Sequence, residues 1–246
     1  MEFTNLKEGV IDLGDGIKLE MVLIPSGRFI MGSPESEFGR RGDETQHEVI
    51  ISKDFYLGKY EVTQEQWERV MGNNPSSEKG KDLPVTDISW DECVEFTKKL
   101  NDTIKQGFRL PTEAEWEYAY RAGTTTAFHS YPEQPNGFND DTLLENIAWF
   151  SNTADSQTHA VGGKFGNGLG LHDMSGNVWE WCQDYWSNTY YASSPITNPT
   201  GPATGSSRLL RGGVWGSSPN DCRASQRNNY SPEFGNNVGF RVVRNP

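Results

Sequence analysis

The sequence lacks any run of about twenty apolar residues, the length that a helix needs to cross a bilayer. Its start, Met1 to Leu13, has acidic residues before any apolar run and no small-residue cleavage site, so it does not resemble a signal peptide. Cysteine is also scarce: three residues without close spacing do not suggest a disulfide framework and are typical of reduced thiols. We therefore expect a cytoplasmic protein without a membrane span.

Positive charge is in short supply as well. The chain has 22 Lys and Arg residues against 34 Asp and Glu residues, which gives a net charge of −12. This charge would repel a phosphate backbone, so we expect no nucleic-acid partner. The acidic excess is typical of a soluble surface, and acidic loops that bind Ca²⁺ would add to it.

Aromatic residues and turn formers are abundant instead. Only 34% of the residues are hydrophobic, so the 8 Trp, 9 Tyr and 12 Phe residues must supply much of the core. The 26 Gly and 13 Pro residues are scattered without a period, which predicts many turns and irregular segments. Nothing in the composition marks a boundary, and we expect one domain over residues 1–246.

Local patterns predict short strands followed by helices. Residues 21–25 and 27–33 read as a hairpin, and residues 47–51 and 55–62 as two further strands. Three helix starts have the capping-box spacing, in which Ser or Thr precedes Gln or Glu by three residues. These pairs are Thr63/Gln66, Ser89/Glu92 and Thr112/Glu115.

The second and third predicted helices carry apolar stripes. The first stripe contains Trp90, Cys93, Val94, Thr97 and Leu100, which places Cys93 in the core. The second contains Trp116, Ala119 and Tyr120, and Gly123 is expected as its left-handed C-terminal cap. We interpret the acidic residues of this helix as a solvated face rather than as catalytic acids: Glu113, Glu115 and Glu117.

Three ordered blocks carry a family resemblance: residues 108–117 (FRLPTEAEWE), residues 176–181 (GNVWEW), and Arg211-Gly212-Gly213 with Gly239-Phe240-Arg241. Together they resemble the formylglycine-generating-enzyme (sulfatase-modifying factor) superfamily from about Met21 to Val243. The resemblance implies an α+β fold, a compact variant of the C-type-lectin fold with short strands, few helices and much irregular loop. It is compatible with the capped helices and long polar loops read from the residues.

Structural Ca²⁺ is a further expectation. A Gly-Asn turn exposes backbone carbonyls, and Glu180 adds a carboxylate oxygen of the kind that Ca²⁺ prefers. By resemblance, one site would use Ser175, Gly176, Val178 and Glu180, and a second would use Asn146, Ile147 and Asp155, although the loop length there departs from that of the enzymes. The alternative is that Glu180 only bonds backbone amides and that no metal binds.

Members of the family that make formylglycine have a Cys-x4-Cys pair that holds copper(I), an ion that prefers two soft thiolates. In this chain Cys222 is the only cysteine of that block, with Ser217 five residues before it and Arg227 five residues after it. A hydroxyl or a guanidinium does not replace a thiolate, so copper is not expected. Cys222 is the only catalytic candidate, and as a nucleophile it would need a histidine base from another segment.

We define residues 211–244 as the C-terminal block. Its expected framework is Gly212, Gly213, Trp215, Cys222, Arg223, Arg227, Pro232, Gly239 and Phe240. The small, polar and aromatic residues between them resemble an adaptable binding surface. The expected exposed ligand-binding residues are Val214, Gly216, Ser217, Ser218, Asn220, Asp221, Ser225, Asn228, Asn229, Tyr230, Ser231 and Phe234, with Tyr230 and Phe234 as aromatic anchors.

This layout is also similar to the variable region of proteins that diversity-generating retroelements rewrite at asparagine codons. We therefore predict a non-catalytic protein that binds a protein or peptide ligand and is diversified in this way. Two alternatives are an undiversified binding or scaffolding protein and a copper-dependent formylglycine-generating oxidase. The missing Cys-x4-Cys pair disfavours the oxidase.

Overall fold

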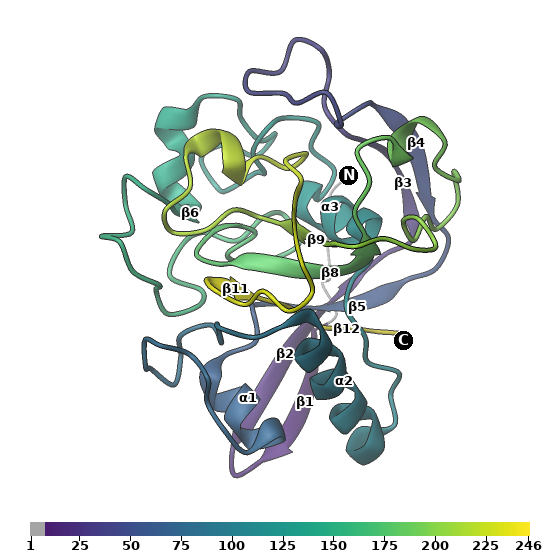
Figure 1. Cartoon of the computed structure of the whole chain (residues 1–246). Helices are drawn as coiled ribbons and strands as arrows, with labels where there is room; N and C mark the ends of the chain where they lie inside the picture. Colours follow the sequence, from purple (N-terminus) through teal and green to yellow (C-terminus); the bar gives the residue numbers. More distant parts are fainter. Residues whose placement is uncertain (1–7) are drawn as a thin grey trace.

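The computed structural model describes residues 8–246, so Met1–Lys7, half of the segment predicted not to be a signal peptide, lie outside the described residues. Short strands, three α-helices and long loops make up the described chain (Figure 1). The α+β class with short strands, few helices and much irregular loop is confirmed. The helices are α1 (Gln64–Met71), α2 (Trp90–Ile104) and α3 (Glu113–Arg121), and three short 3₁₀ segments are η1 (Asp141–Asn146), η2 (Tyr190–Ala192) and η3 (Pro219–Cys222).

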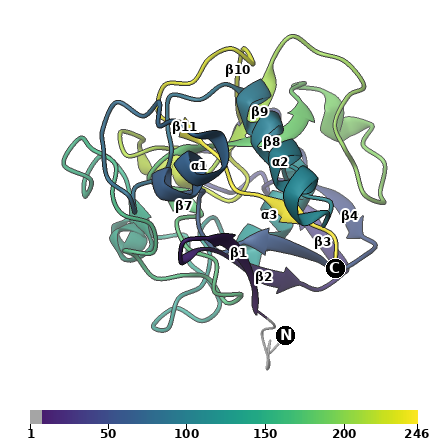
Figure 2. The same cartoon turned by 90° about the horizontal axis from the view of Figure 1, so that it is seen from below.

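One four-stranded sheet joins the two ends of the described chain. Its order is β1 (Glu8–Gly14), β2 (Ile17–Ile24), β5 (Phe55–Gly58) and β12 (Val243–Arg244). The helices α1 and α2 pack side by side near this sheet, as the view from below shows (Figure 2). Aromatic rings pack where these two helices meet. The ring centroids of Trp67 and Phe96 are stacked 5.5 Å apart, and Phe240 contacts both rings edge-on. We call β1, β2, α1 and α2 the helical layer.

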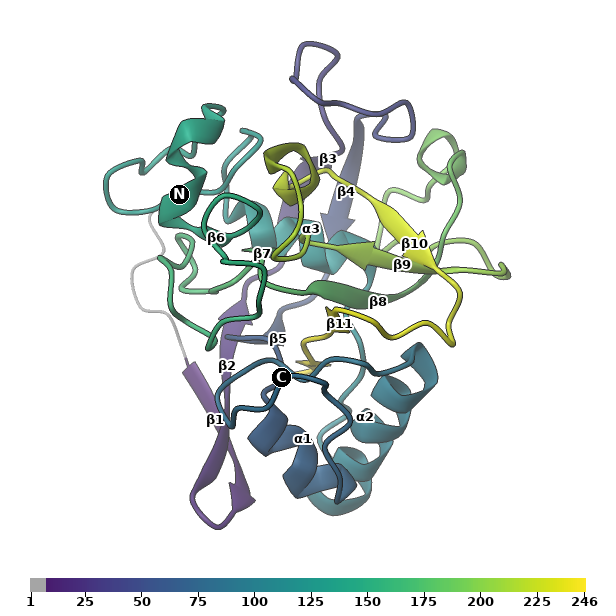
Figure 3. The ribbon, with the colours of Figure 1, turned by 60° about the vertical axis from the view of Figure 1, so that its left-hand side comes forward.

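A second four-stranded sheet carries the C-terminal block. Its order is β10 (Asn228–Tyr230), β9 (Arg208–Arg211), β8 (Trp179–Tyr185) and β11 (Val238–Gly239), so β10 is an edge strand (Figure 3). Helix α3 packs against β8 and β9. Two small pairs complete the strands: β3 (Gly27–Met31) with β4 (His47–Ile51), and β6 (Ala148–Trp149) with β7 (Ser175–Gly176).

The predicted hairpin over residues 21–33 is wrong, although both halves are strands. β2 pairs with β1 and β5, whereas β3 pairs with β4, so the turn between β2 and β3 carries the chain from one sheet to another. Residues 47–51 form a strand as expected, whereas the strand expected over residues 55–62 ends at Gly58. These two strands also belong to different sheets, because the apolar alternation that predicts a strand does not specify its partner.

All three predicted helix starts are confirmed, each with a complete capping box. Cys93 is fully buried as expected, and so are Trp116, Ala119 and Tyr120. One detail is wrong: Val94 is 37% exposed while Phe96 fills the core. Gly123 is left-handed as expected, with a φ of 88°, but the left-handed conformation begins one residue earlier, at the C-cap Ala122. Within residues 8–246, no helix combines the length and the apolar character that crossing a membrane requires.

Candidate ligand-binding surface

Four buried arginines anchor the C-terminal block to the rest of the molecule. Each forms an ion pair with a carboxylate from another part of the sequence, and hydrogen bonds between charged groups are the strong ones. The pairs are Arg211 with Glu117, Arg223 with Glu37 and Glu44, Arg227 with Glu113, and Arg241 with Glu180. The path of the block is therefore fixed by its arginines as well as by its very short strands.

Arg223 shows how these anchors work. Its guanidinium lies 2.5 Å from Glu37 and 2.8 Å from Glu44, and it donates a hydrogen bond to the carbonyl of Gly39. Burial alone would raise the pKa of Glu44, but hydrogen bonds from Arg223 and Ser33, together with the charge of Arg223, hold that pKa below its ordinary value. The pair is therefore ionised at neutral pH and clamps the loop of residues 33–46 onto the block.

Arg227 makes a similar anchor at the start of α3. It lies 2.6 Å from Glu113, and its guanidinium stacks 4.0 Å from the ring of Tyr191. Burial works to raise the pKa of Glu113, but the charges of Arg227 and Arg211 outweigh it and lower that pKa. Glu113 is thus held as a buried carboxylate.

The expected solvated face of α3 is therefore wrong for two of its three glutamates. Glu113 is 2% exposed, and Glu117 is fully buried between Arg121 and Arg211. Arg211 and Arg227 lie about a hundred residues further along the chain, so nothing in the local sequence reveals these pairs. Glu115 pairs with the half-buried Arg109.

Most of the predicted ligand-binding residues are accessible, in two segments separated by the buried stretch 222–227. Two of the twelve are wrong as exposed residues: Ser225 is fully buried, bonded to Glu37 and Glu44, and Ser217 is 7% exposed, its hydroxyl accepting from the Val214 amide. The others are partly or fully exposed: Val214, Gly216, Ser218, Asn220, Asp221, Asn228, Asn229, Tyr230, Ser231 and Phe234.

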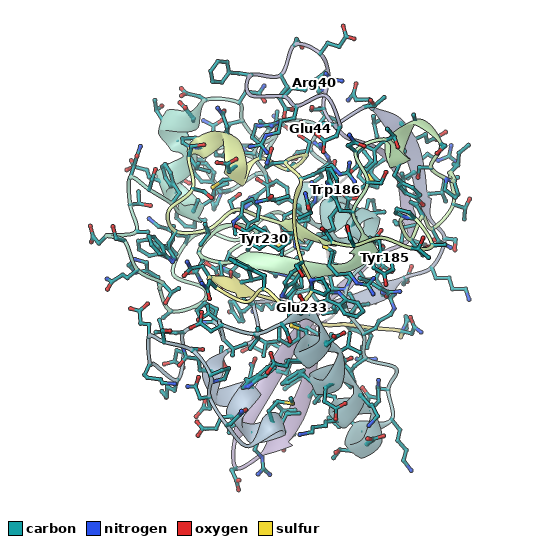
Figure 4. The ribbon with its side chains drawn as sticks, viewed as in Figure 1. Arg40, Glu44, Tyr185, Trp186, Tyr230 and Glu233 are labelled. Carbon is teal, nitrogen blue, oxygen red and sulfur yellow. The ribbon has the colours of Figure 1, made fainter. Side chains whose placement is uncertain are left out.

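The two predicted aromatic anchors lie together. The rings of Tyr230 and Phe234 are 4.3 Å apart, and Phe234 is 41% exposed. In the sheet register Tyr230 pairs with Arg208, which pairs with Tyr185, so these three residues form a row across β10, β9 and β8; its two tyrosines are labelled in Figure 4. The guanidinium of Arg208 lies 3.5 Å from the Tyr185 ring centroid and 3.6 Å from that of Trp90, which gives the row a rigid base.

A pocket of about 410 Å³ lies beside the row and includes residues that sequence reasoning missed. Asn228 and Asn229 line it from the block, while Arg41, Trp186 and Asn188 line it from two other loops. Trp186 follows β8 directly, but no periodic signal marks it as part of a surface. The lining combines Trp186 and several side-chain amides with charged groups that are already paired, Arg227 with Asp43 and Arg41 with Asp221.

Cys222 is fully buried in a cluster that includes Ala127 and Phe128, and burial raises the pKa of its thiol far above the ordinary value. Each of the four histidine rings bonds instead to a backbone carbonyl. Ser217 and Arg227, the neighbours at a spacing of five, hold no thiolate, and Arg227 is committed to Glu113. The donor set therefore does not fit copper(I), and a buried neutral thiol is a poor nucleophile.

The predicted calcium ligand Glu180 is already engaged. Arg241 contacts both of its oxygens at 2.7 Å, and the indole N–H of Trp116 donates to one of them at 2.8 Å. A cation at Glu180 would face the Arg241 guanidinium, so Glu180 fits poorly as the principal ligand.

The other three predicted ligands of this site are buried close to Glu180 in the chain. The hydroxyl of Ser175 donates to the carbonyl of Cys222 at 3.0 Å. The amide of Gly176 donates to a carbonyl of the C-terminal block, and the amide of Val178 donates to the carboxylate of Glu61. These bonds tie the segment to the protein itself.

Sequence reasoning missed two acidic residues close to Glu180. Asp173 is 1% exposed, and its Oδ1 is buried without a hydrogen-bond partner among residues 8–246. Burial raises the pKa of Glu61 and of Asp173, and the charges of the neighbouring carboxylates act in the same direction on Glu61. With Glu180, these carboxylates outnumber the guanidinium of Arg241, and this excess of negative charge favours a proton on Glu61 or Asp173.

The second predicted calcium site has less support. The Asn146 side chain donates two hydrogen bonds within the protein, and its backbone carbonyl accepts from the Phe165 amide at 3.1 Å. Ile147 is fully buried, whereas Asp155 is exposed. No group of three or more His, Cys, Asp or Glu side chains within residues 8–246 is arranged to hold a metal ion.

Comparison with known proteins places this geometry in a family. The model of the sulfatase-modifying factor enzyme 1-like domain matches residues 17–246. The chain is 33% identical to the chaperone protein LppX of Paenibacillus barcinonensis, over 79% of this chain and 81% of that protein. It is 35% identical to the formylglycine-generating enzyme of Streptomyces coelicolor, over 72% of this chain but only 57% of the enzyme.

Solved structures agree with this assignment. Treponema denticola variable protein 1 is similar with a TM-score of 0.87 and 29% identity, over 97% of this chain and 99% of that one. PvdO from Pseudomonas aeruginosa is similar with a TM-score of 0.84 and 27% identity, over 97% and 98%. The chain therefore belongs to the family of sulfatase-modifying factor enzyme 1-like domains.

Proposed function

We propose that this protein is a non-catalytic member of its family that binds a protein or peptide ligand through the C-terminal block. The observation that carries the proposal is the division of the block into buried arginine anchors and accessible residues between them. Substitution at the accessible positions leaves the anchors in place. This is the property that a surface selected for varied ligands requires.

The likeness to a protein named as a variable protein supports diversification of the same block by a retroelement. A near-identical template repeat beside a reverse-transcriptase gene, differing mainly at adenines, is the expected genomic finding. Its absence would overturn diversification and leave binding itself standing. The three unpaired, buried cysteines support a reducing compartment such as the cytoplasm.

Binding is tested by selecting peptides from a random displayed library on the immobilised protein. We expect selected peptides to lose at least about tenfold in affinity for a variant with Asn228, Asn229, Tyr230 and Phe234 changed to Ala. A matched control changes Glu95 and Lys98 to Ala on the exposed face of α2. Failure to select any peptide, or equal loss in both variants, would overturn the proposal.

Catalysis is tested with the copper-loaded protein and a Cys-x-Pro-x-Arg peptide, the aldehyde product being sought by mass spectrometry. We expect none, because the buried Cys222 has no partner thiolate in its block. Turnover that disappears in a Cys222→Ser variant would show that the protein is an oxidase.

We also propose that a structural Ca²⁺ ion binds with Asp173, rather than Glu180, as its main carboxylate. The buried, unpartnered Oδ1 of Asp173 supports this choice. Excess chelator should then lower the melting temperature of the wild type, because a ligand that binds only the folded state stabilises it. An unchanged melting temperature would overturn calcium binding itself, and the same decrease in Asp173→Asn would remove Asp173 as the main ligand.

A further inference from the structure

A second pocket, of about 470 Å³, adjoins the C-terminal block. The residues of the block that line it precede Asn228 and Asn229 in the sequence. Three segments build it: the loop of residues 34–38, the loop around Phe128 and Asp140, and Asn220 with Arg223 from the block. The pocket is thus continuous with the accessible segment 214–221 of the candidate surface.

The apolar part of this pocket has an unusual member. Ala127 and Phe128 are buried beneath it, but Phe38 is 80% exposed at its rim. A phenylalanine ring left in water gains nothing from burial, so its position at the mouth of a pocket suits contact with a ligand. The ring offers a flat apolar face to the stem of a long side chain and a π-face to a cation.

The charge of the pocket is negative and uncompensated. Arg223, the one cation of the lining, is shared between Glu37 and Glu44, so it leaves no positive charge to offset the other acidic residues. Asp140 and Asp141 are exposed at the rim, and neither forms an ion pair with another of residues 8–246. The Asp140 side chain accepts hydrogen bonds from the amide and hydroxyl of Thr142, and these bonds lower the pKa of its carboxyl and keep it charged.

We infer that this pocket receives an arginine or lysine side chain of the peptide ligand. The stem of that side chain packs on Phe38, and its cation lies between the carboxylates of Asp140 and Asp141. The net charge of −12 attracts a basic ligand over longer distances, so association weakens as salt increases. This inference rests on the proposed function and adds the chemical class of the ligand.

The selected peptides test the inference directly. Peptides selected on the wild type should be enriched in Arg and Lys relative to the library, and those selected on a variant with Asp140→Asn and Asp141→Asn should not. Asn retains the helix-capping ability of Asp140, so the change removes charge while preserving the fold. The matched control is Glu145→Gln, an exposed acid in the same 3₁₀ segment that does not line the pocket.

For one selected basic peptide, the double Asp variant and Phe38→Ala should each weaken binding about tenfold, and replacing the basic residue by Gln should do the same. The effects of the Asp variant and of the Gln peptide should not add, because both remove one interaction. Peptides selected without basic enrichment would overturn this inference and leave the proposed function intact. Selection of no peptide at all would overturn both.

Discussion

The helical layer and the C-terminal block hold their positions by different physics. In the helical layer, Trp67 and Phe96 stack within an apolar core, and local capping boxes begin the helices. In the block, Arg223 and Arg227 reach carboxylates that lie more than a hundred residues earlier in the chain. Apolar packing tolerates side chains of similar volume, whereas a buried ion pair requires both of its partners. We therefore expect the block to tolerate substitution at the residues between its buried arginines but not at the arginines themselves.

The largest predicted effect on stability comes from removing one of the buried arginines that anchor the block. Arg227→Met keeps the approximate volume but leaves Glu113 buried without its cation, and we expect a loss of about 4 kcal/mol in the free energy of unfolding. Urea unfolding measures this loss. Adding Glu113→Gln should recover more than half of it, because the uncompensated charge is then gone. A double variant as unstable as Arg227→Met would mean that packing, not charge, holds the block.

A smaller effect concerns His129, whose ring lies 5.2 Å from that of Tyr120, which in turn bonds to the carbonyl of Cys222 in the block. Burial lowers the pKa of His129 from 6.5 to about 4. The unfolded chain therefore takes up a proton at a higher pH than the folded chain does. The contribution of His129 to the free energy of unfolding is therefore present above pH 6.5 and is lost as the pH falls towards 4.

When the pH falls from about 7 to about 5, protonation of this histidine in the unfolded chain should lower the free energy of unfolding by about 2 kcal/mol. Comparing urea unfolding of the wild type and His129→Leu at both pH values isolates the contribution. The variant should lose less stability over this interval than the wild type. Equal losses would show that other groups cause the pH dependence.

The matching change in the helical layer should be milder. Phe96→Leu removes two ring contacts but leaves an apolar side chain in an apolar site, and we expect a loss of about 1 kcal/mol. Thermal and urea unfolding measure it beside Arg227→Met. A loss as large as that of the arginine variant would remove the proposed contrast between the two regions.

The same contrast explains what can be predicted from the sequence. The helix starts at Thr63, Ser89 and Thr112 are predictable because a capping box is complete within four residues. The burial of Glu113 and Glu117 is not, because their arginine partners are remote and an isolated helix with these residues would expose them. Strand pairing cannot be predicted for a related reason: the alternation of apolar and polar residues predicts a strand but does not specify the strand with which it pairs.

The candidate surface is predictable in part. Its framework positions Cys222, Arg223 and Arg227 are buried, whereas Trp215 and Pro232, expected in the same framework, are partly exposed. The spacing of framework and polar residues does not reveal that Ser225 is needed inside, where it bonds to two buried carboxylates, nor that Trp186 joins the surface from another loop. Both facts depend on contacts between segments distant in sequence.

The smallest expected effect on stability comes from the accessible residues. Asn229 is half-buried, and its side chain makes no hydrogen bond in the described part of the chain, so Asn229→Ser should change the free energy of unfolding by less than about 0.5 kcal/mol. Ser225→Ala is the matched comparison in the same block: it removes a hydroxyl bonded to two buried carboxylates and should cost about 1–2 kcal/mol. Unfolding measurements on both variants decide whether accessibility marks the tolerant positions. If Asn229→Ser proved as costly as Ser225→Ala, the residues between the anchors would be part of the scaffold, and their variation could not generate new ligand specificities without loss of the fold.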